Sequence, residues 1–187
     1  MSRLQEIGVG GWVDRIEERG PLDALFASKY KELRRIASNL TRRDPGVTLS
    51  PTALVNEAWL RLADSPELGG LSPAHFKAIA ARAMRRVLID AARRRKTLKR
   101  SGGGAVLIEL DDVIEAHAIR DEDVLGLDAA LQDLARLEPR QALLVESRYF
   151  GGLTVSELAQ LLDVSVTTVE RDWRVAKAWL KLQLRRR

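Results

Sequence analysis

The stretch "LTVSELAQLLDVSVTTVERDWRVAKAWL", residues 153–180, contains the starts of two helices within a dozen residues. Thr154 and Glu157 have the spacing of a capping box, in which the hydroxyl accepts a hydrogen bond from the N3 amide and the carboxylate reaches back. Ser165 is a favourable N-cap for a second helix, and Asp163 tolerates the left-handed backbone that a tight turn needs. The stretch therefore predicts a helix, a turn of three residues and a second helix.

The two sides of the second predicted helix indicate what it contacts. At about 100° per residue, its apolar side chains gather on one side and must be buried. They are Val169, Trp173, Ala176 and Leu180. Thr167, Arg171 and Arg174 lie on the opposite side. This arrangement is typical of a DNA-binding helix-turn-helix, whose second helix enters the major groove. The alternative is an ordinary helical hairpin with solvated arginines, but the caps, the turn and the basic outer side together favour DNA.

Composition limits the classes of protein that this chain can be. Of the 187 residues, 45% are hydrophobic, which is enough for one large domain or two small ones. We find neither an apolar run long enough to span a membrane nor a secretory signal, so we expect a cytoplasmic protein. Because the chain has no cysteine, disulfides, thiol catalysis and Cys-ligated metal centres are excluded. We expect no metal, no cofactor and no small-molecule substrate.

Charge is distributed unevenly along the chain, whose net charge is +5. Residues 85–100 contain eight basic residues and one acidic residue, whereas residues 105–123 contain seven acidic residues and one basic residue. The C-terminal "KLQLRRR" is basic again. This order favours a polyanion that is bound at both ends of the chain and repelled in the middle.

Helical periodicity runs through nearly every segment, and no stretch alternates as a half-buried strand does. We predict an all-α fold, with one helix near residues 11–19 and another that starts at Pro21. "SGGGA" interrupts the pattern after residue 100, and the acidic stretch that follows has few apolar residues. We therefore predict two small helical domains at 1–100 and 123–187, joined by a flexible acidic linker at 101–122.

A long predicted helix after Ser72 carries a basic stripe. Arg82, Arg86 and Arg93 share one side, with Arg85 adjacent, while Phe76 begins the apolar side. A solvated face with paired arginines is the alternative. The run "RRRKTLKR" that follows favours a polyanion, because so many like charges repel one another unless they are neutralised.

The segment "LVNEAWLRL", residues 54–62, is apolar on one wide side, with Asn56, Glu57 and Arg61 beside it. Such a helix is either part of the core or a surface that docks a partner helix, and both interpretations stay open at this point.

Several motifs occur in an order that resembles one known family. They are "LFASKYKELRRIA" at 25–37, "LVNEAWLRL" at 54–62, "HFKAIAARAMRRVLIDAARRR" at 75–95 and the stretch at 137–180 that contains the helix-turn-helix. Together they resemble the extracytoplasmic-function (ECF) sigma factors, specificity subunits of bacterial RNA polymerase that keep only sigma domains 2 and 4. The branch with T-V-E-R-D-W in region 4 is the most similar. The resemblance covers residues 12–184.

The resemblance implies three sets of site residues. Those that contact the core polymerase, at the clamp helices of its largest subunit, are Asn56, Glu57 and Arg61. Those that contact or melt the downstream (minus-ten) promoter element are Phe76, Arg82, Arg85, Arg86, Asp90 and Arg93. Those that face the upstream (minus-thirty-five) element are Thr167, Thr168, Glu170, Arg171 and Arg174.

The function that the resemblance implies is promoter recognition, DNA melting and transcription initiation by a protein that is not an enzyme. Its expected partners are the polymerase core, through the clamp helices and the flap, and promoter DNA, with an anti-sigma factor as a further candidate. The alternative is a stand-alone, dimeric helix-turn-helix regulator. An enzyme is disfavoured because His75 and His117 are the sole near-neutral bases and neither has a nucleophile motif beside it.

Overall fold

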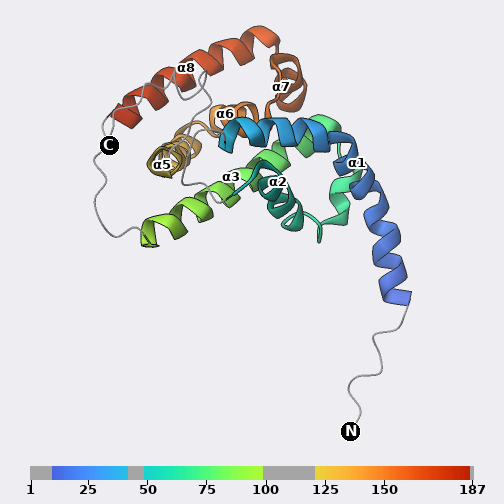
Figure 1. The fold of residues 1–187 in the computed structure, drawn as a ribbon. Helices are drawn as coiled ribbons and strands as arrows, with labels where there is room; N and C mark the ends of the chain where they lie inside the picture. Colours follow the sequence, from blue (N-terminus) through green and yellow to red (C-terminus); the bar gives the residue numbers. More distant parts are fainter. Residues whose placement is uncertain (1–9, 42–48, 99–120, 186–187) are drawn as a thin grey trace.

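Every element of the described structure is a helix (Figure 1). A computed structural model describes residues 10–41, 49–98 and 121–185, and within these ranges it contains seven α-helices, one 3-10 helix and no strand. The predicted all-α fold is thereby confirmed. The elements in chain order are α1 (Gly10–Thr41), α2 (Pro51–Leu60), η1 (Pro66–Gly70), α3 (Pro73–Leu98), α5 (Asp121–Leu137), α6 (Pro139–Gly151), α7 (Val155–Leu162) and α8 (Val166–Arg185).

Helices α7 and α8 form the predicted helix-turn-helix. Thr154 Oγ1 accepts from the amide of Glu157 at 3.2 Å, and Glu157 Oε2 accepts from the amide of Thr154 at 2.8 Å, so the capping box is confirmed. Asp163 ends α7 in the left-handed region, with φ 51°. Ser165 Oγ accepts from the amide of Thr168 at 3.1 Å and caps α8. These short-range bonds fix where both helices begin.

The apolar side of α8 packs against α5, α6 and α7. Val169, Ala176 and Leu180 are buried as predicted, while Trp173 is half-buried. Before α7, the left-handed Gly152 (φ 61°) ends α6, and its amide bonds back to the carbonyl of Arg148 at 3.1 Å. This tight ending sets the direction in which the chain enters the helix-turn-helix.

Helix α1 is a single helix, and the prediction that a new helix starts at Pro21 is wrong. Pro21 lies inside α1, which bends along its length in Figure 1. Proline removes one helical hydrogen bond and is a common cause of such bends, but it does not oblige a helix to end. Leu22, directly after it, is fully buried, so packing holds this part of the helix against the core.

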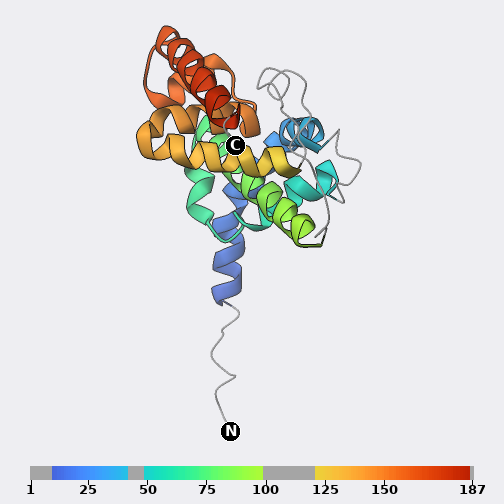
Figure 2. The same cartoon turned by 90° about the vertical axis from the view of Figure 1, so that its left-hand side faces the viewer.

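Helix α3 lies at the centre and contacts helices from both halves of the chain: α1 and α2 from the first, α5, α6 and α7 from the second. Figures 1 and 2 both show α5 and α6 between α3 and α8. The buried residues form one continuous cluster that includes Leu54 and Met84 as well as Leu144 and Phe150. The two halves of the chain therefore share a hydrophobic core in this structure.

The division into two domains stays a prediction. The predicted linker at 101–122 lies outside the described residues, apart from its last two positions, which begin α5. Among the described helices, none combines the length and the apolar character needed to cross a membrane.

Candidate nucleic-acid interface

The outer side of α8 presents polar side chains from the helix-turn-helix. Thr167, Glu170, Arg171 and Arg174 are exposed, and the side chain of Arg171 is 65% exposed. Thr168 is less accessible, because its hydroxyl lies 2.8 Å from Ser165 Oγ at the helix cap. Thr167 is therefore the hydroxyl of this pair that faces solvent beside the free amides of the helix start, where an anion is favoured.

Asp172 lies on the buried side of α8 and stabilises this surface through ion pairs. Sequence reasoning missed this residue. Its side chain is 5% exposed and accepts from Arg140 Nη2 at 2.7 Å and Arg140 Nε at 2.9 Å. Asp172 Oδ1 also lies 3.6 Å from Arg171 Nε. A signal was available, because Asp172 is three residues after Val169 and four before Ala176, which places it on the buried stripe of the helix.

A cation–π contact joins α6 to α8. The guanidinium of Arg148 lies 4.4 Å from the centre of a Trp173 ring. Burial lowers the pKa of Arg148 below its ordinary value, although the group stays charged. Together with the pair between Arg140 and Asp172, this contact fixes the rotation of α8 relative to α6.

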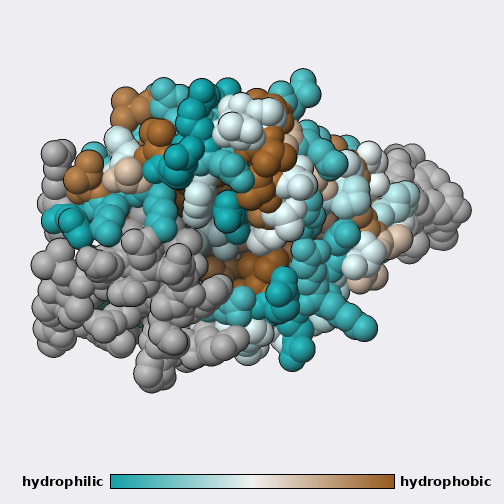
Figure 3. Space-filling model, turned by 90° about the horizontal axis from the view of Figure 1, so that it is seen from above, coloured by the Kyte–Doolittle hydropathy of each residue, from teal (hydrophilic) through white to brown (hydrophobic). Residues whose placement is uncertain are grey.

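Hydrophobic side chains are also exposed along α8. Val166 is 45% exposed, Val175 51% and Leu182 56%. Figure 3, which looks down on the molecule from the side of α8, shows hydrophobic patches set among hydrophilic residues. This side of the molecule is therefore mixed in character, and its cationic residues are interrupted by apolar ones.

The arginines predicted on and beside the basic stripe of α3 do not all face solvent in the structure. Arg82, Arg86 and Arg93 are exposed, in line with the predicted outer side. Arg85 is not, since its side chain is only 13% exposed. Phe76, which the resemblance places among the downstream-element residues, is fully buried and packs in the core. The sequence predicted an apolar side for Phe76, and its position in the structure is on that side.

Arg85 is held by two carboxylates from the second half of the chain. Its Nη2 lies 2.7 Å from Asp128 Oδ1 and donates to the Asp128 carbonyl at 3.1 Å, and its Nη1 lies 3.0 Å from Glu146 Oε1. Asp128 is in α5 and Glu146 is in α6, and both side chains are almost fully buried. Arg93 Nη2 approaches the same Asp128 at 3.7 Å but is 62% exposed.

Helix α2 separates into a buried and an exposed side. Leu54, Val55 and Ala58 are buried, and Trp59 stacks on Phe26 with ring centres 4.2 Å apart. The apolar stripe of α2 is therefore core, whereas the polar residues beside the stripe face solvent.

On that exposed side, Asn56 and Glu57 are accessible. Leu60 lies one turn further on and is 66% exposed, so it is an apolar residue of this surface that sequence reasoning missed. Arg61 Nη2 lies 2.8 Å from Asp90 Oδ2 of α3, so the expected polymerase-contact and downstream-element sets meet at one ion pair. These residues form one small mixed surface beside α3.

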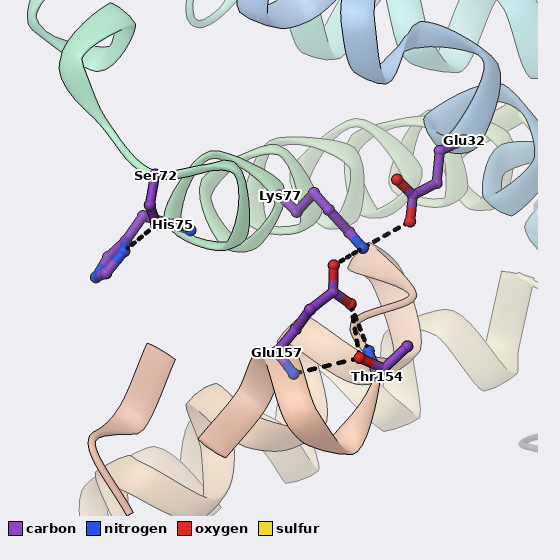
Figure 4. A network of polar contacts seen from close by, with 6 residues as sticks. All are labelled: Glu32, Ser72, His75, Lys77, Thr154 and Glu157. Atoms are coloured by element: carbon purple, nitrogen blue, oxygen red, sulfur yellow. Dashed lines mark hydrogen bonds and ion pairs between the residues drawn. The ribbon is translucent and has the colours of Figure 1, made fainter. Parts of the chain in front are cut away.

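Lys77 is a fully buried cation that sequence reasoning also missed (Figure 4). Its Nζ lies 2.6 Å from Glu32 Oε1 of α1 and 2.8 Å from Glu157 Oε1 of α7. Burial alone would raise the pKa of Glu157, but the hydrogen bonds from Lys77 and Thr154 outweigh it and hold that pKa below its ordinary value. Lys77 therefore links α3 to both its first-half and second-half neighbours.

His75 has a structural partner at the start of α3. Its Nδ1 lies 2.8 Å from Ser72 Oγ, and Figure 4 shows both residues turned away from the Lys77 cluster. His117 lies outside the described residues. Within the described ranges, no group of three or more His, Asp and Glu side chains is placed to hold a metal ion.

Comparison with protein-family models gives one family for this chain. The model described as ECF sigma factor matches residues 17–186, which include the basic helix α3 as well as the helix-turn-helix. No curated protein and no solved structure gives a match.

Proposed function

This chain belongs to the ECF sigma factor family, and on that premise we propose that it binds the core of bacterial RNA polymerase and selects promoters through α3 and α8. Like its family, it is a sigma factor that acts in transcription initiation. The observation that carries the proposal is the extent of the family match, which runs through α2 and α3 as well as the helix-turn-helix. A match confined to the helix-turn-helix would suit a stand-alone regulator equally well. The polymerase carries out RNA synthesis, and the factor contributes free energy by binding the polymerase and the promoter DNA.

The proposed upstream-element surface is the outer side of α8. Arg171 and Arg174, exposed about one and two helical turns inside the start of α8, can reach base edges, where arginine is the usual partner of guanine O6 and N7. Glu170 can accept from a cytosine amine. Thr167 and Thr168 are short, so the amides at the helix start can approach a phosphate.

The proposed downstream-element surface is the outer side of α3. Arg82, Arg86 and Arg93 are exposed along this helix and can neutralise backbone phosphates. Arg85 and Asp90 belong to the same set but are paired within the protein. Strand opening requires bases to be unstacked and held, and a row of exposed basic side chains can stabilise the separated strand.

The proposed polymerase surface is the exposed side of α2, through Asn56, Glu57 and Arg61, to which we add Leu60. Exposed apolar side chains beside polar ones are typical of a helix that docks on partner helices. The expected docking site for this surface is the clamp helices of the largest subunit. The flap of the polymerase is a further expected contact of the factor, and an anti-sigma factor is a further candidate partner. Because the polymerase lies in the cytoplasm, we expect the factor to act there.

Transcription with purified polymerase tests the proposal. The full chain is mixed with core enzyme and with fragments of genomic DNA, and the fragments that the mixture protects are sequenced. We expect protection and RNA synthesis only when core enzyme is present. A matched reaction with core enzyme alone gives the background.

The dimeric regulator makes the opposite prediction. It requires a footprint from the protein without polymerase, on a site with two-fold symmetry. Three results together would favour the dimeric regulator over the proposed function. They are such a footprint, a dimeric mass in solution and no transcription with core enzyme.

A further inference from the structure

Asp90 is the one acidic residue of α3, whose other charged side chains are cations. Arg86 lies one turn before it and Arg94 one turn after it, at spacings that allow ion pairs along a helix. Among the residues that the structure describes, Asp90 pairs with neither of them. Its Oδ2 lies 2.8 Å from Nη2 of Arg61, which directly follows α2. The carboxylate therefore acts between two helices.

Arg61 also has an available partner on its own helix, which it does not use. Glu57 lies four residues before it, and glutamate followed by a cation at this spacing is the favourable order for a pair. The backbone of Arg61 is still helical, with φ −75° and ψ −18°, so the spacing is kept. Within the described ranges, Glu57 has neither a hydrogen bond nor an ion pair. Asp90 therefore turns Arg61 toward α3 and leaves Glu57 unpaired.

The pair between Arg61 and Asp90 lies at the surface of the protein. The two side chains are 36% and 42% exposed. Exposed ion pairs are screened by water and salt and add little to the stability of a fold. Leu60, the residue before Arg61, is 66% exposed and belongs to the exposed side of α2. The pair therefore fixes a long, flexible side chain at the edge of the proposed polymerase surface and contributes little to folding.

We propose that Asp90 is a positioning residue for the polymerase surface and is not a contact of the downstream promoter element. It holds the guanidinium of Arg61 in place before the polymerase binds and keeps it away from Glu57. Both charges of α2 are then ready for the partner. The inference rests on the proposed function, because it takes the exposed side of α2 to be the surface that docks on the polymerase.

Holding Arg61 in advance favours docking, because a side chain that is already ordered loses less conformational freedom when the partner binds. Ordering one flexible side chain at an interface changes affinity by about 2- to 13-fold. A contact with the DNA backbone is less favourable for Asp90, since its carboxylate and the phosphates are both anions and repel one another. The ion pair thus moves Asp90 from the expected DNA-contacting set to the docking of core enzyme.

The first test removes the carboxylate. Asp90→Ala in the full chain should weaken binding to core RNA polymerase by about 2- to 13-fold. Titration of chain labelled at its N-terminus with core enzyme measures this affinity by fluorescence anisotropy. Arg61→Ala should weaken binding at least as much, and adding Asp90→Ala to it should have no further effect, because no guanidinium is left to position. Additive losses, or unchanged binding by the Asp90→Ala variant, would overturn the proposal.

Two variants control for net charge and for the loss of an ion pair. Asp133→Ala removes the same charge and breaks the exposed pair with Arg136 on α5, so core binding should be unchanged. Asp90→Glu keeps a carboxylate beside Arg61 and should retain most of the affinity. Urea unfolding checks that each variant folds, and it should change little because both pairs are exposed. An equal loss of core binding by Asp133→Ala would assign the effect to net charge and contradict the proposal.

Exchanging the two charges separates positioning from a merely structural pair. Arg61→Asp with Asp90→Arg restores opposite charges between α2 and α3 with their places reversed. We expect core binding at least as weak as that of Arg61→Ala, because the guanidinium no longer stands beside the polymerase surface. If the pair only joined the two helices, the exchanged protein would bind core enzyme as the unchanged chain does, and this recovery would refute the positioning role.

Strand opening distinguishes the positioning role from a DNA contact. With core enzyme in excess, all of the Asp90→Ala variant is bound in spite of its lower affinity. Permanganate reactivity at the start site should then be no lower than with the unchanged chain. Reduced opening by the fully bound variant would return Asp90 to the downstream-element residues.

The results also separate this inference from the proposed function. If the unchanged chain binds core enzyme and directs transcription while Asp90→Ala binds equally well, the positioning role is wrong and the sigma-factor function stands. If the unchanged chain neither binds core enzyme nor directs transcription, the proposed function fails and the positioning role fails with it.

Discussion

Glu157 binds Lys77 with one oxygen and closes the capping box of α7 with the other. Oε1 lies 2.8 Å from Lys77 Nζ, while Oε2 accepts from the Thr154 amide at 2.8 Å. Glu157, which helps to cap the first helix of the helix-turn-helix, therefore also ties that helix to α3. Changes at Glu157 should affect both helix α7 and the contact between the two halves of the chain.

Acid should weaken the protein through Glu157. Its pKa in the folded protein is below the ordinary value of 4.5, because the bonds from Lys77 and Thr154 outweigh burial. The folded state thus binds protons less readily than the unfolded state, so the stabilisation is complete above the ordinary pKa and is lost as pH falls through the lower, folded value. Urea unfolding between about pH 6 and pH 3 measures this loss. Glu157→Gln should lose less stability over that range than the unchanged protein, and an identical loss would contradict the assignment.

Removing the hydroxyl of the capping box should destabilise the helix-turn-helix. Thr154→Ala leaves the Glu157 amide without its acceptor, and N-cap losses of this kind cost about 0.5–2 kcal/mol. Ser156→Ala, an exposed change two residues later, is the matched control and should be close to neutral. Urea unfolding of the full chain measures both. Equal stability of the two variants would show that the cap contributes nothing.

Base discrimination should depend on Arg171. Arg171→Ala removes a side chain that can bind a guanine edge, and a bidentate contact of this kind is worth about 1–3 kcal/mol of discrimination. Competition between promoter variants for the assembled polymerase measures the effect. Retention of core enzyme in a pull-down should be unchanged, since Arg171 is remote from α2. Unaltered promoter choice would leave Arg171 as a solvated residue.

Polymerase binding should depend on the exposed side of α2. Asn56→Ala with Glu57→Ala, or Leu60→Ala alone, should weaken association with core enzyme while folding is kept, because these side chains are exposed and their removal opens no cavity. Asp64→Ala, exposed just beyond α2, is the control. The pull-down is repeated alongside a mass measurement in solution. Normal core binding with a loss of self-association would favour the dimeric regulator.

Strand opening should depend on the exposed arginines of α3. Replacing Arg82, Arg86 and Arg93 by alanine should leave the factor folded and bound to polymerase, yet reduce permanganate reactivity at the start site. For each arginine that contacts a phosphate, replacement by alanine should also reduce the slope of log affinity against log salt by about 1. Lys31→Ala with Arg35→Ala removes exposed cations from α1 as a comparison. Full opening by the α3 variant would return its arginines to the solvated-face interpretation.

Sequence reasoning succeeded where the determining contacts are local. The capping box, the left-handed Asp163 and the Ser165 cap involve residues no more than four positions apart, so the local sequence specifies the two helix starts. The buried stripe of α8 follows from helical phase in the same way. The exposure of Arg82, Arg86 and Arg93 was correct for the same reason.

Sequence reasoning failed for side chains whose partners are distant along the chain. Arg85 was predicted beside the basic stripe, but Asp128 and Glu146 draw it inward, and no local pattern connects these residues. The buried position of Lys77 was missed for the same reason, since the two carboxylates that pair with it lie 45 residues before it and 80 residues after it. Leu60 is exposed because the stripe of α2 is covered by α1 and α3. The boundary between the buried and the exposed side of α2 therefore depends on how the neighbouring helices pack.

The distance between Lys77 and Glu157 also has a consequence for a chain that is still being synthesised. The ribosome adds the 80 residues that separate them over roughly 4 to 16 s, at about 5–20 residues per second. During that interval the lysine has only Glu32 as a partner, and Arg85 lacks both of its carboxylates until the first of them, 43 residues after it, has been added. The nascent chain therefore passes through a period in which all of α3 has been made but Arg85 and Lys77 still lack carboxylates that enclose them in the folded protein.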